Sequence, residues 1–244
     1  MRSTEVSRTV IVCDTLAEMS AAAARDVASA AADAVARRKR FAIALSGGET
    51  PRPLYHLLAR EYRDAIAWDR AEVCFADDRC VPPHNPQSNF RLVWSTLLEH
   101  VPVVEERVHR ILGELGPDAA AREYDARLRR LFVDDAGTPT FDIALLGVGA
   151  DGHTASLFPG DTALDERKRW AAPAHAPLGV KVRERVTLTL PVLNRARVVM
   201  FLCAGPEKQA VVSRILSATD PELPAARVFG AERTIWLLDR AAAP

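Results

Sequence analysis

The middle of the chain reads Phe141-Asp-Ile-Ala-Leu-Leu-Gly-Val-Gly-Ala-Asp-Gly-His-Thr-Ala-Ser-Leu-Phe-Pro159, and this stretch indicates both the fold and a site. Its mainly apolar run 141–146 has the length and composition of a buried strand. Asp151 and His153 follow in a turn with three glycines, a residue type that permits close backbone approach: Gly147, Gly149 and Gly152. We therefore expect an acid and a titratable base on a loop at a strand end, where active-site residues commonly lie.

The same turn, Gly147-Val-Gly-Ala-Asp-Gly152, also spells the G-x-G-x-x-G pattern of dinucleotide-binding proteins. That pattern requires a helix that starts at its last glycine and an acidic residue about 20 positions further on, at a strand end. Here Pro159-Gly160 allows at most about two helical turns, and the next acids, Asp165 and Glu166, lie in a polar segment. The sequence therefore argues against a nicotinamide or flavin cofactor, and we expect no cofactor.

Composition limits the classes of function. The 244 residues contain 32 Lys+Arg and 32 Asp+Glu, so no overall charge favours nucleic acid or an anionic membrane. No run approaches the roughly 18 apolar residues of a membrane span, and the N-terminus lacks the apolar region of a secretory signal. The four cysteines form no C-x-x-C pair and are typical of small core residues: Cys13, Cys74, Cys80 and Cys203. We expect a reduced, cytoplasmic protein without a metal.

Strand-like and helix-like segments alternate along the chain. The predicted strands are 9–13, 41–45, 72–76, 141–146, 186–190, 198–203 and 234–238. The predicted helices are 16–34, 51–60, 88–99, 118–132 and 207–216. Such alternation predicts the α/β class, with a mainly parallel open sheet and helices on both faces. We read residues 1–244 as a single domain and Arg167–Lys181 as an excursion from it.

The segment Ser46-Gly-Gly-Glu-Thr-Pro51 lies between a predicted strand and a predicted helix. Its small residues expose backbone N–H groups, its two hydroxyls add donors, and the helix N-terminus adds partial positive charge. These features predict an anion cradle, most naturally for phosphate, formed by Ser46, Gly47, Gly48 and Thr50. The alternative is an ordinary tight turn in which Thr50 caps the helix.

Charged residues gather beside three further strands. Asp77-Asp-Arg-Cys-Val-Pro-Pro83 follows one strand, and the Ser88-Asn89 pair after it is expected to cap a helix. Lys181-Val-Arg-Glu-Arg185 precedes another strand, and Gly205-Pro-Glu-Lys208 follows a third. Each cluster could be a solvated face. Ligands of open α/β sheets bind at the strand ends, however, so these clusters supply candidate substrate- and phosphate-binding residues: Asp77, Arg79, Lys181, Arg185 and Lys208.

Together these segments resemble the 6-phosphogluconolactonase family. The motifs that carry the resemblance are Leu45-Ser-Gly-Gly-Glu-Thr-Pro51, Asp77-Asp-Arg-Cys-Val-Pro82 with Ser88-Asn89, Gly147-Val-Gly-Ala-Asp-Gly-His-Thr-Ala-Ser-Leu-Phe-Pro-Gly160, Arg185-Val-Thr-Leu-Thr-Leu-Pro191 with Asn194, and Gly205-Pro-Glu-Lys208. Two departures are visible. Asp78 stands where the family usually has Glu, and Lys181-Val-Arg stands where the family often has Lys-Pro-Pro.

The resemblance implies a Rossmann-like domain that hydrolyses 6-phospho-D-glucono-1,5-lactone to 6-phosphogluconate in the oxidative pentose phosphate pathway. Because imidazole titrates near neutral pH, His153 is expected to be the general base, with Asp151 orienting its ring. Backbone N–H groups of Gly147, Gly149 and Gly152 could stabilise the oxyanion. The chain is expected to be a monomer or a weak homodimer. The main rival function is that of a glucosamine-6-phosphate deaminase/isomerase, and a pure binding module is a second alternative.

Overall fold

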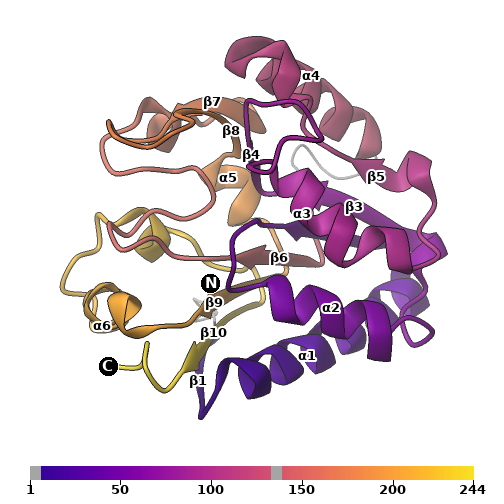
Figure 1. Cartoon of the computed structure of the whole chain (residues 1–244), viewed down its shortest axis with the longest axis horizontal. Coiled ribbons are helices and arrows are strands. Elements are labelled where there is room, and N and C mark those ends of the chain that lie inside the picture. The colour runs from indigo at the N-terminus through magenta and orange to yellow at the C-terminus, as the bar shows by residue number, and fades with distance from the viewer. Residues whose placement is uncertain (1–6, 133–138) are drawn as a thin grey trace, which may run out of the picture.

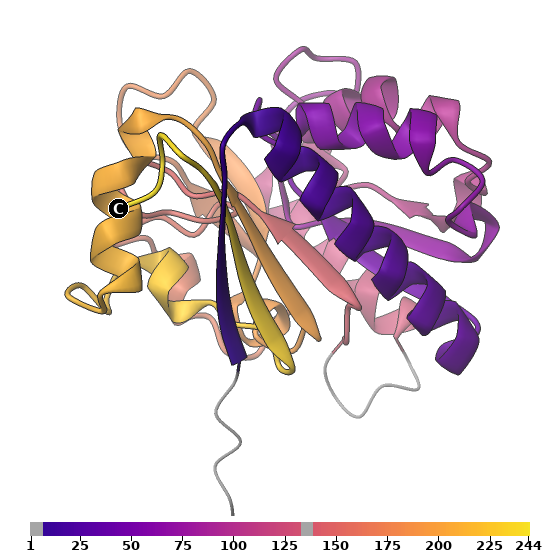
Figure 2. The same cartoon turned by 90° about the horizontal axis from the view of Figure 1, so that it is seen from below.

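Seven parallel strands form the main sheet of the computed structural model, which describes residues 7–132 and 139–244. Their order across the sheet is β1-β10-β9-β6-β2-β3-β5. Figures 1 and 2 show the molecule from two directions. The bounds of the strands are β1 Ser7–Cys13, β2 Phe41–Leu45, β3 Ala71–Phe75, β5 Val108–His109, β6 Ile143–Leu146, β9 Val198–Cys203 and β10 Arg233–Asp239. The predicted parallel α/β sheet is confirmed, and the predicted bounds of β2 and β9 match residue for residue.

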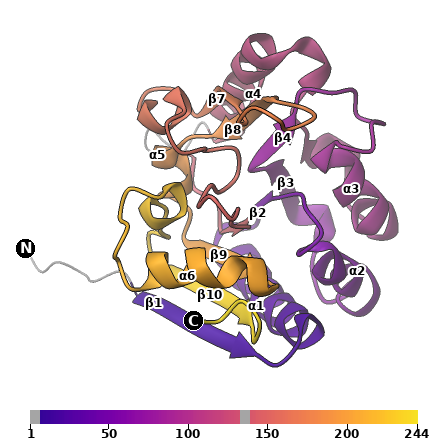
Figure 3. The ribbon, with the colours of Figure 1, turned by 60° about the vertical axis from the view of Figure 1, so that its left-hand side comes forward.

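Helices cover both faces of this sheet, as the sequence predicts. Figure 2 shows α1 (Leu16–Arg38), α2 (Arg52–Glu61) and α3 (Asn89–Thr96) on one side and α6 (Gln209–Leu216) on the other. Figure 3 shows α2 and α3 side by side. The remaining α-helices are α4 (Pro117–Leu131) and α5 (Leu190–Leu193). Single turns of 3₁₀ helix occur at Trp68–Arg70, Leu98–His100, Glu105–Arg107, Gly113–Leu115, Thr162–Asp165, Pro206–Lys208 and Pro224–Arg227.

Helix α1 illustrates how local sequence sets these elements. Its N-terminus is capped by Thr15, whose hydroxyl accepts a hydrogen bond from the Glu18 N–H. Its end is marked by Lys39, which adopts a left-handed conformation. One face is buried at three- and four-residue steps: Met19, Ala23, Val27, Ala31 and Ala34. The β2 and β3 strands are buried at every position, as expected for parallel strands covered on both sides. No helix among the described residues is long and apolar enough to cross a membrane.

A second, three-stranded antiparallel sheet is a feature that sequence reasoning missed. Its strand order is β4 (Asp77–Arg79), β8 (Glu184–Leu188), β7 (Ala171–His175). The sequence analysis placed 77–79 after a strand, treated 167–181 as an excursion, and predicted no strand in either segment. The residues of β4 lack the apolar alternation of a strand and are ordered by pairing with β8, more than 100 residues further on. A second correction concerns position, because the strand predicted at 186–190 lies two residues closer to the N-terminus, at Glu184–Leu188.

The order of connections places a crevice between β2 and β6. These two strands are neighbours, but the chain continues from β2 toward β3 on one side and from β6 toward β9 on the other. Such a reversal separates the loops at the carboxyl ends of the two strands and leaves a ligand-sized gap. The loop after β2 begins with Ser46, and the loop after β6 begins with Gly147. The fold therefore brings the predicted anion cradle and the predicted acid–base loop to the same edge of the sheet.

Candidate functional site

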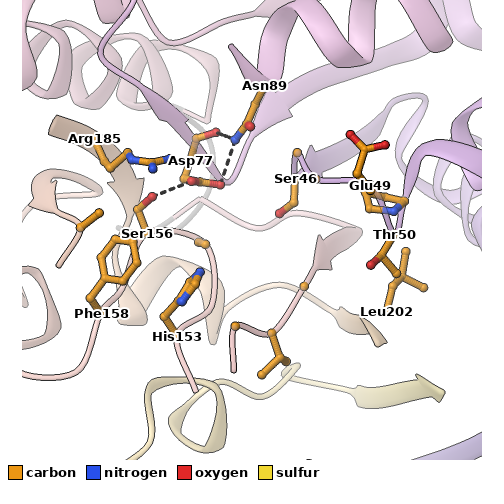
Figure 4. Close-up of a pocket in the computed structure, with 18 of the residues that line it drawn as sticks. Ser46, Glu49, Thr50, Asp77, Asn89, His153, Ser156, Phe158, Arg185 and Leu202 are labelled. Atoms are coloured by element: carbon orange, nitrogen blue, oxygen red, sulfur yellow. Dashed lines mark hydrogen bonds between the residues drawn. The ribbon is translucent and has the colours of Figure 1, made fainter. Parts of the chain in front are cut away.

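A cleft of about 440 Å³ opens at this edge of the sheet (Figure 4). Most of the site residues predicted from the sequence line it: Ser46, Gly47, Gly48, Thr50, Asp77, Arg79, Gly147, Gly149, His153, Arg185 and Lys208. Three predicted residues do not line it: Asp151, Gly152 and Lys181. Segments far apart in the sequence therefore line one cleft. No single motif could have predicted this convergence.

His153 and Asp151 form the pair that the sequence suggested. The Nδ1 atom of His153 lies 2.6 Å from Oδ1 of Asp151, which also accepts a 3.1 Å hydrogen bond from the His153 backbone N–H. The hydrogen bond to the imidazole holds the pKa of Asp151 below its usual value, so this carboxylate stays ionised and can only accept. Nδ1 must then carry the proton, which leaves Nε2 of His153 with a free lone pair. Figure 4 shows the imidazole extending into the cleft.

The glycine turn holds this pair through its backbone. The Gly149 N–H donates to the carbonyl of His153 at 2.8 Å, and the Gly152 N–H donates to the carbonyl of Gly149 at 2.9 Å. A Cβ atom on Gly149 would overlap the side chains of His153 and Asp151, so glycine is required there for the close approach. These bonds correct one expectation: the amides of Gly149 and Gly152 are used within the turn and are not directed at an oxyanion.

Phe158 packs on the imidazole of His153. Its ring centroid lies 4.6 Å from that of His153, with the planes tilted by 41°. Phe158 is almost fully buried and lines the cleft, so one side of the imidazole faces an apolar ring. Together with the Asp151 hydrogen bond, this contact fixes the orientation of the imidazole from two directions.

The loop after β2 has the features of an anion cradle. The Ser46 hydroxyl is buried and has no hydrogen-bond partner among the described residues, and Figure 4 shows the side chain on the cleft side of its loop. The hydroxyl of Tyr55 donates to the Ser46 carbonyl at 2.5 Å and so fixes the start of the loop. Gly48 has a φ of 101°, which favours glycine. Thr50 is not the helix cap, because α2 is preceded by Pro51 without a side-chain cap, and Thr50 lines the cleft instead.

Two arginines lie opposite each other on adjacent strands of the small antiparallel sheet. Arg79 on β4 lies directly opposite Arg185 on β8 in the strand register. Like charges in this position repel, since directly opposed side chains lie about 5 Å apart. Arg185 is only 7% exposed, and burial, followed by the field of Arg79, lowers the pKa of its guanidinium. Two buried or half-buried cations that line one cleft constitute a site for a negatively charged group.

A hydrogen-bonded network connects Arg79 to the loop that carries Asp151 and His153. Asp77 accepts a 2.6 Å hydrogen bond from the Ser156 hydroxyl, and the Asn89 amide donates to the Asp77 carbonyl at 2.9 Å. Nη1 of Arg79 in turn donates to Oδ1 of Asn89 at 2.5 Å. Sequence reasoning missed Ser156 and treated Asn89 only as a capping residue. Their positions inside quoted motifs were the only available signal, because their partners lie up to 79 residues away.

Asp78 organises the start of α3. Its carboxylate accepts hydrogen bonds from the backbone N–H groups of Arg79, Asn89 and Phe90 and from the Ser88 hydroxyl. Burial nevertheless dominates and raises the pKa of Asp78 to about 6. Ser88 caps the helix as predicted, accepting from the Arg91 N–H at 3.3 Å. The Asp in place of the usual Glu therefore has a structural role and holds Arg79 and Asn89 in place.

The two predicted lysines differ in position. Lys208 follows β9 and lines the cleft. Lys181 is exposed and lies outside the cleft lining, although its neighbour Val180 contributes to it. Within residues 7–132 and 139–244, no group of three or more His, Cys, Asp or Glu side chains is arranged to hold a metal ion.

Comparison with known proteins identifies relatives of the whole chain. Residues 14–236 match the profile of the family described as glucosamine-6-phosphate isomerases/6-phosphogluconolactonase. A 6-phosphogluconolactonase of Homo sapiens is 42% identical over 93% of this chain and 89% of its own length. The solved 6-phosphogluconolactonase of Trypanosoma brucei superposes with a TM-score of 0.85 at 29% identity, covering 98% of both chains. A solved monomeric glucosamine-6-phosphate deaminase shares the fold, with a TM-score of 0.82 at 20% identity over 96% of this chain and 98% of its own.

Proposed function

The chain belongs to the glucosamine-6-phosphate isomerase/6-phosphogluconolactonase family, and we propose that it uses His153 to hydrolyse 6-phospho-D-glucono-1,5-lactone to 6-phosphogluconate. This is the lactonase step of the oxidative pentose phosphate pathway. The high coverage of relatives that bear the lactonase name supports the reaction. The observation that supports the mechanism is the His153–Asp151 pair, which offers a proton acceptor at the cleft and, among the described residues, has no hydrogen bond to a serine hydroxyl.

The reaction needs a base because water is a poor nucleophile toward an ester. In our proposal Nε2 of His153 takes a proton from water as the water oxygen bonds to C1 of the lactone. The tetrahedral intermediate then collapses, the bond from C1 to the ring oxygen breaks, and imidazolium returns the proton to that oxygen. The negative charge of Asp151 stabilises the imidazolium that forms in between. The carboxylic acid product ionises in water and releases one proton for each turnover.

The two ends of the cleft suit the two ends of the substrate. Figure 4 shows Ser46 and Thr50 at one side of the cleft and His153, Asp77 and Arg185 toward the other. We assign the phosphate to the 46–50 loop and to Lys208, where hydroxyls, backbone amides and a cation can surround it. We assign the developing oxyanion, and later the product carboxylate, to the opposed Arg79 and Arg185. No step in this mechanism requires a metal or a cofactor.

Two assays on one preparation test the proposal. Proton release on freshly generated 6-phosphogluconolactone, followed with phenol red and corrected for spontaneous hydrolysis, should exceed the blank by orders of magnitude. Ammonia release from glucosamine-6-phosphate should stay at background. Ammonia release without lactone hydrolysis would assign the chain to the deaminase branch of the family, and background in both assays would favour a binding module. We place the reaction in the cytoplasm, consistent with four free cysteines, and expect a monomer or weak homodimer.

A further inference from the structure

A second cavity lies beside the catalytic cleft, between the starts of α2 and α3. Its volume is about 510 Å³, and we call it the arginine pocket for the residues that define it: Arg52, Arg79 and Arg91, with Gly48, Glu49 and Gln87. Three of these, Gly48, Glu49 and Arg79, also line the cleft, so the two spaces adjoin. Figure 3 shows the two helices that flank it lying side by side.

The charge of the arginine pocket is strongly one-sided. Its lining holds three arginines and a single acid, Glu49, in a chain whose total formal charge is zero. Glu49 is already paired, because both of its carboxylate oxygens accept from Arg52 at 2.9 Å. The remaining two cations, Arg79 and Arg91, have no carboxylate partner in the pocket.

Arg91 is an exposed arginine that lines the pocket without an acidic partner. Its guanidinium makes no hydrogen bond or ion pair with a described residue. It lies in the first turn of α3, and neither this turn nor the first turn of α2 contains an acid. A cation near the positive end of a helix is disfavoured. Arg79 adds a buried Nε that has no partner among the described residues. Both observations point to an anion that is supplied from solution.

We infer that the arginine pocket binds a phosphate group of a small organic molecule while the catalytic cleft is occupied. Arginine is suited to this role because its planar guanidinium presents paired N–H donors to phosphate oxygens. The volume exceeds that of inorganic phosphate and accommodates a molecule the size of a sugar phosphate. Because Arg79 and Gly48 belong to both spaces, the bound anion contacts residues of the active site without entering it.

Phosphate titrations on the product-loaded protein test this inference. The chain is saturated with 6-phosphogluconate, inorganic phosphate is added as the probe, and binding is followed by calorimetry. We expect one further phosphate per chain, bound at least about 10-fold more weakly in Arg91→Ala, since a charge-assisted hydrogen bond is lost. Arg60→Ala is the matched control, an exposed arginine in the last turn of α2 outside the pocket, and should bind phosphate like the wild type.

The outcomes separate this inference from the proposed function. Absence of phosphate binding to the loaded wild type, or equal binding in Arg91→Ala, would overturn the inference. Weaker 6-phosphogluconate binding in Arg91→Ala would make the pocket part of the substrate site and would overturn it as well. Should the chain fail to bind 6-phosphogluconate, the proposed function fails. In that case the number of phosphate ions bound per unloaded chain still tests the arginine pocket, because Arg91→Ala should bind one phosphate fewer than Arg60→Ala.

Discussion

The Cα atom of Gly149 lies so close to the imidazole of His153 that no methyl group fits between them. The same missing methyl group leaves room for Asp151, whose Oδ1 contacts Nδ1 of His153 at 2.6 Å. The geometry of the base thus depends on a residue that has no side chain and carries no charge. A glycine that looks like part of a cofactor fingerprint in the sequence leaves, in the structure, the space that His153 and Asp151 occupy.

Replacing Gly149 with Ala should therefore damage catalysis more than folding. The added Cβ displaces His153 and Asp151, and a shift of about 1 Å in a catalytic group can cost about 10²-fold in kcat. Gly147→Ala is the matched control, because a Cβ there meets no atom within 4 Å. Steady-state kinetics and thermal unfolding of both variants check this. A folded Gly149→Ala protein with the kcat of the wild type would show that the close approach does not matter.

Substrate selectivity distinguishes the two ends of the cleft. Lys208→Ala should lower kcat/KM for 6-phosphogluconolactone roughly 10- to 150-fold, the worth of one charge-assisted hydrogen bond, and should hardly affect unphosphorylated gluconolactone. Arg185→Ala should reduce both activities alike, because it faces the lactone in our proposal. Lys181→Ala, which removes an exposed cation outside the cleft lining, serves as the comparison. If Lys181→Ala lowered kcat/KM for the phosphorylated substrate alone, and did so more than Lys208→Ala, Lys181 and not Lys208 would be the phosphate contact.

Asp78 should make stability depend on pH. Its pKa of about 6 in the folded chain exceeds the value of about 3.9 for a free side chain, so the folded state binds this proton more tightly. The resulting stabilisation is complete below about pH 4 and is lost as the pH rises through about 6. Compared with Asp78→Asn, which cannot titrate, the wild type should lose relative stability between pH 4 and pH 7. Urea unfolding of both chains measures the difference, and a relative gain over that range would contradict the assignment.

Chelation should leave the activity unchanged. Within the described part of the chain, no further His, Cys, Asp or Glu side chain joins His153 and Asp151 in a group that could hold a metal ion, and the mechanism assigns no step to a metal. The measurement is the lactonase rate after exhaustive treatment with EDTA, compared with an untreated sample. Loss of the rate and its recovery with zinc would make His153 a ligand and would remove it from the role of base.

The parts of this protein that follow from local pattern were predictable from its sequence. The β2 and β9 strands are continuous apolar runs. The loops after β2 and β6 carry glycines and small polar residues, and these indicate a binding loop without knowledge of any other segment. The second sheet was not predictable, because β4 consists of Asp77, Asp78 and Arg79 and exists only through pairing with β8. For the same reason, the opposition of Arg79 and Arg185 and the Ser156–Asp77 hydrogen bond could not be predicted from the sequence. They depend on a register between segments about 80 to 110 residues apart.

The central claim is that His153 is the general base of lactone hydrolysis, and the kcat of His153→Ala on 6-phosphogluconolactone tests it most directly. Removing a placed base should lower kcat by about 10²–10⁴-fold with a smaller change in KM, after subtraction of the spontaneous rate. Circular dichroism and thermal unfolding must show that the variant is folded, which its position in a half-exposed turn favours. A folded His153→Ala protein with the kcat of the wild type would contradict the account.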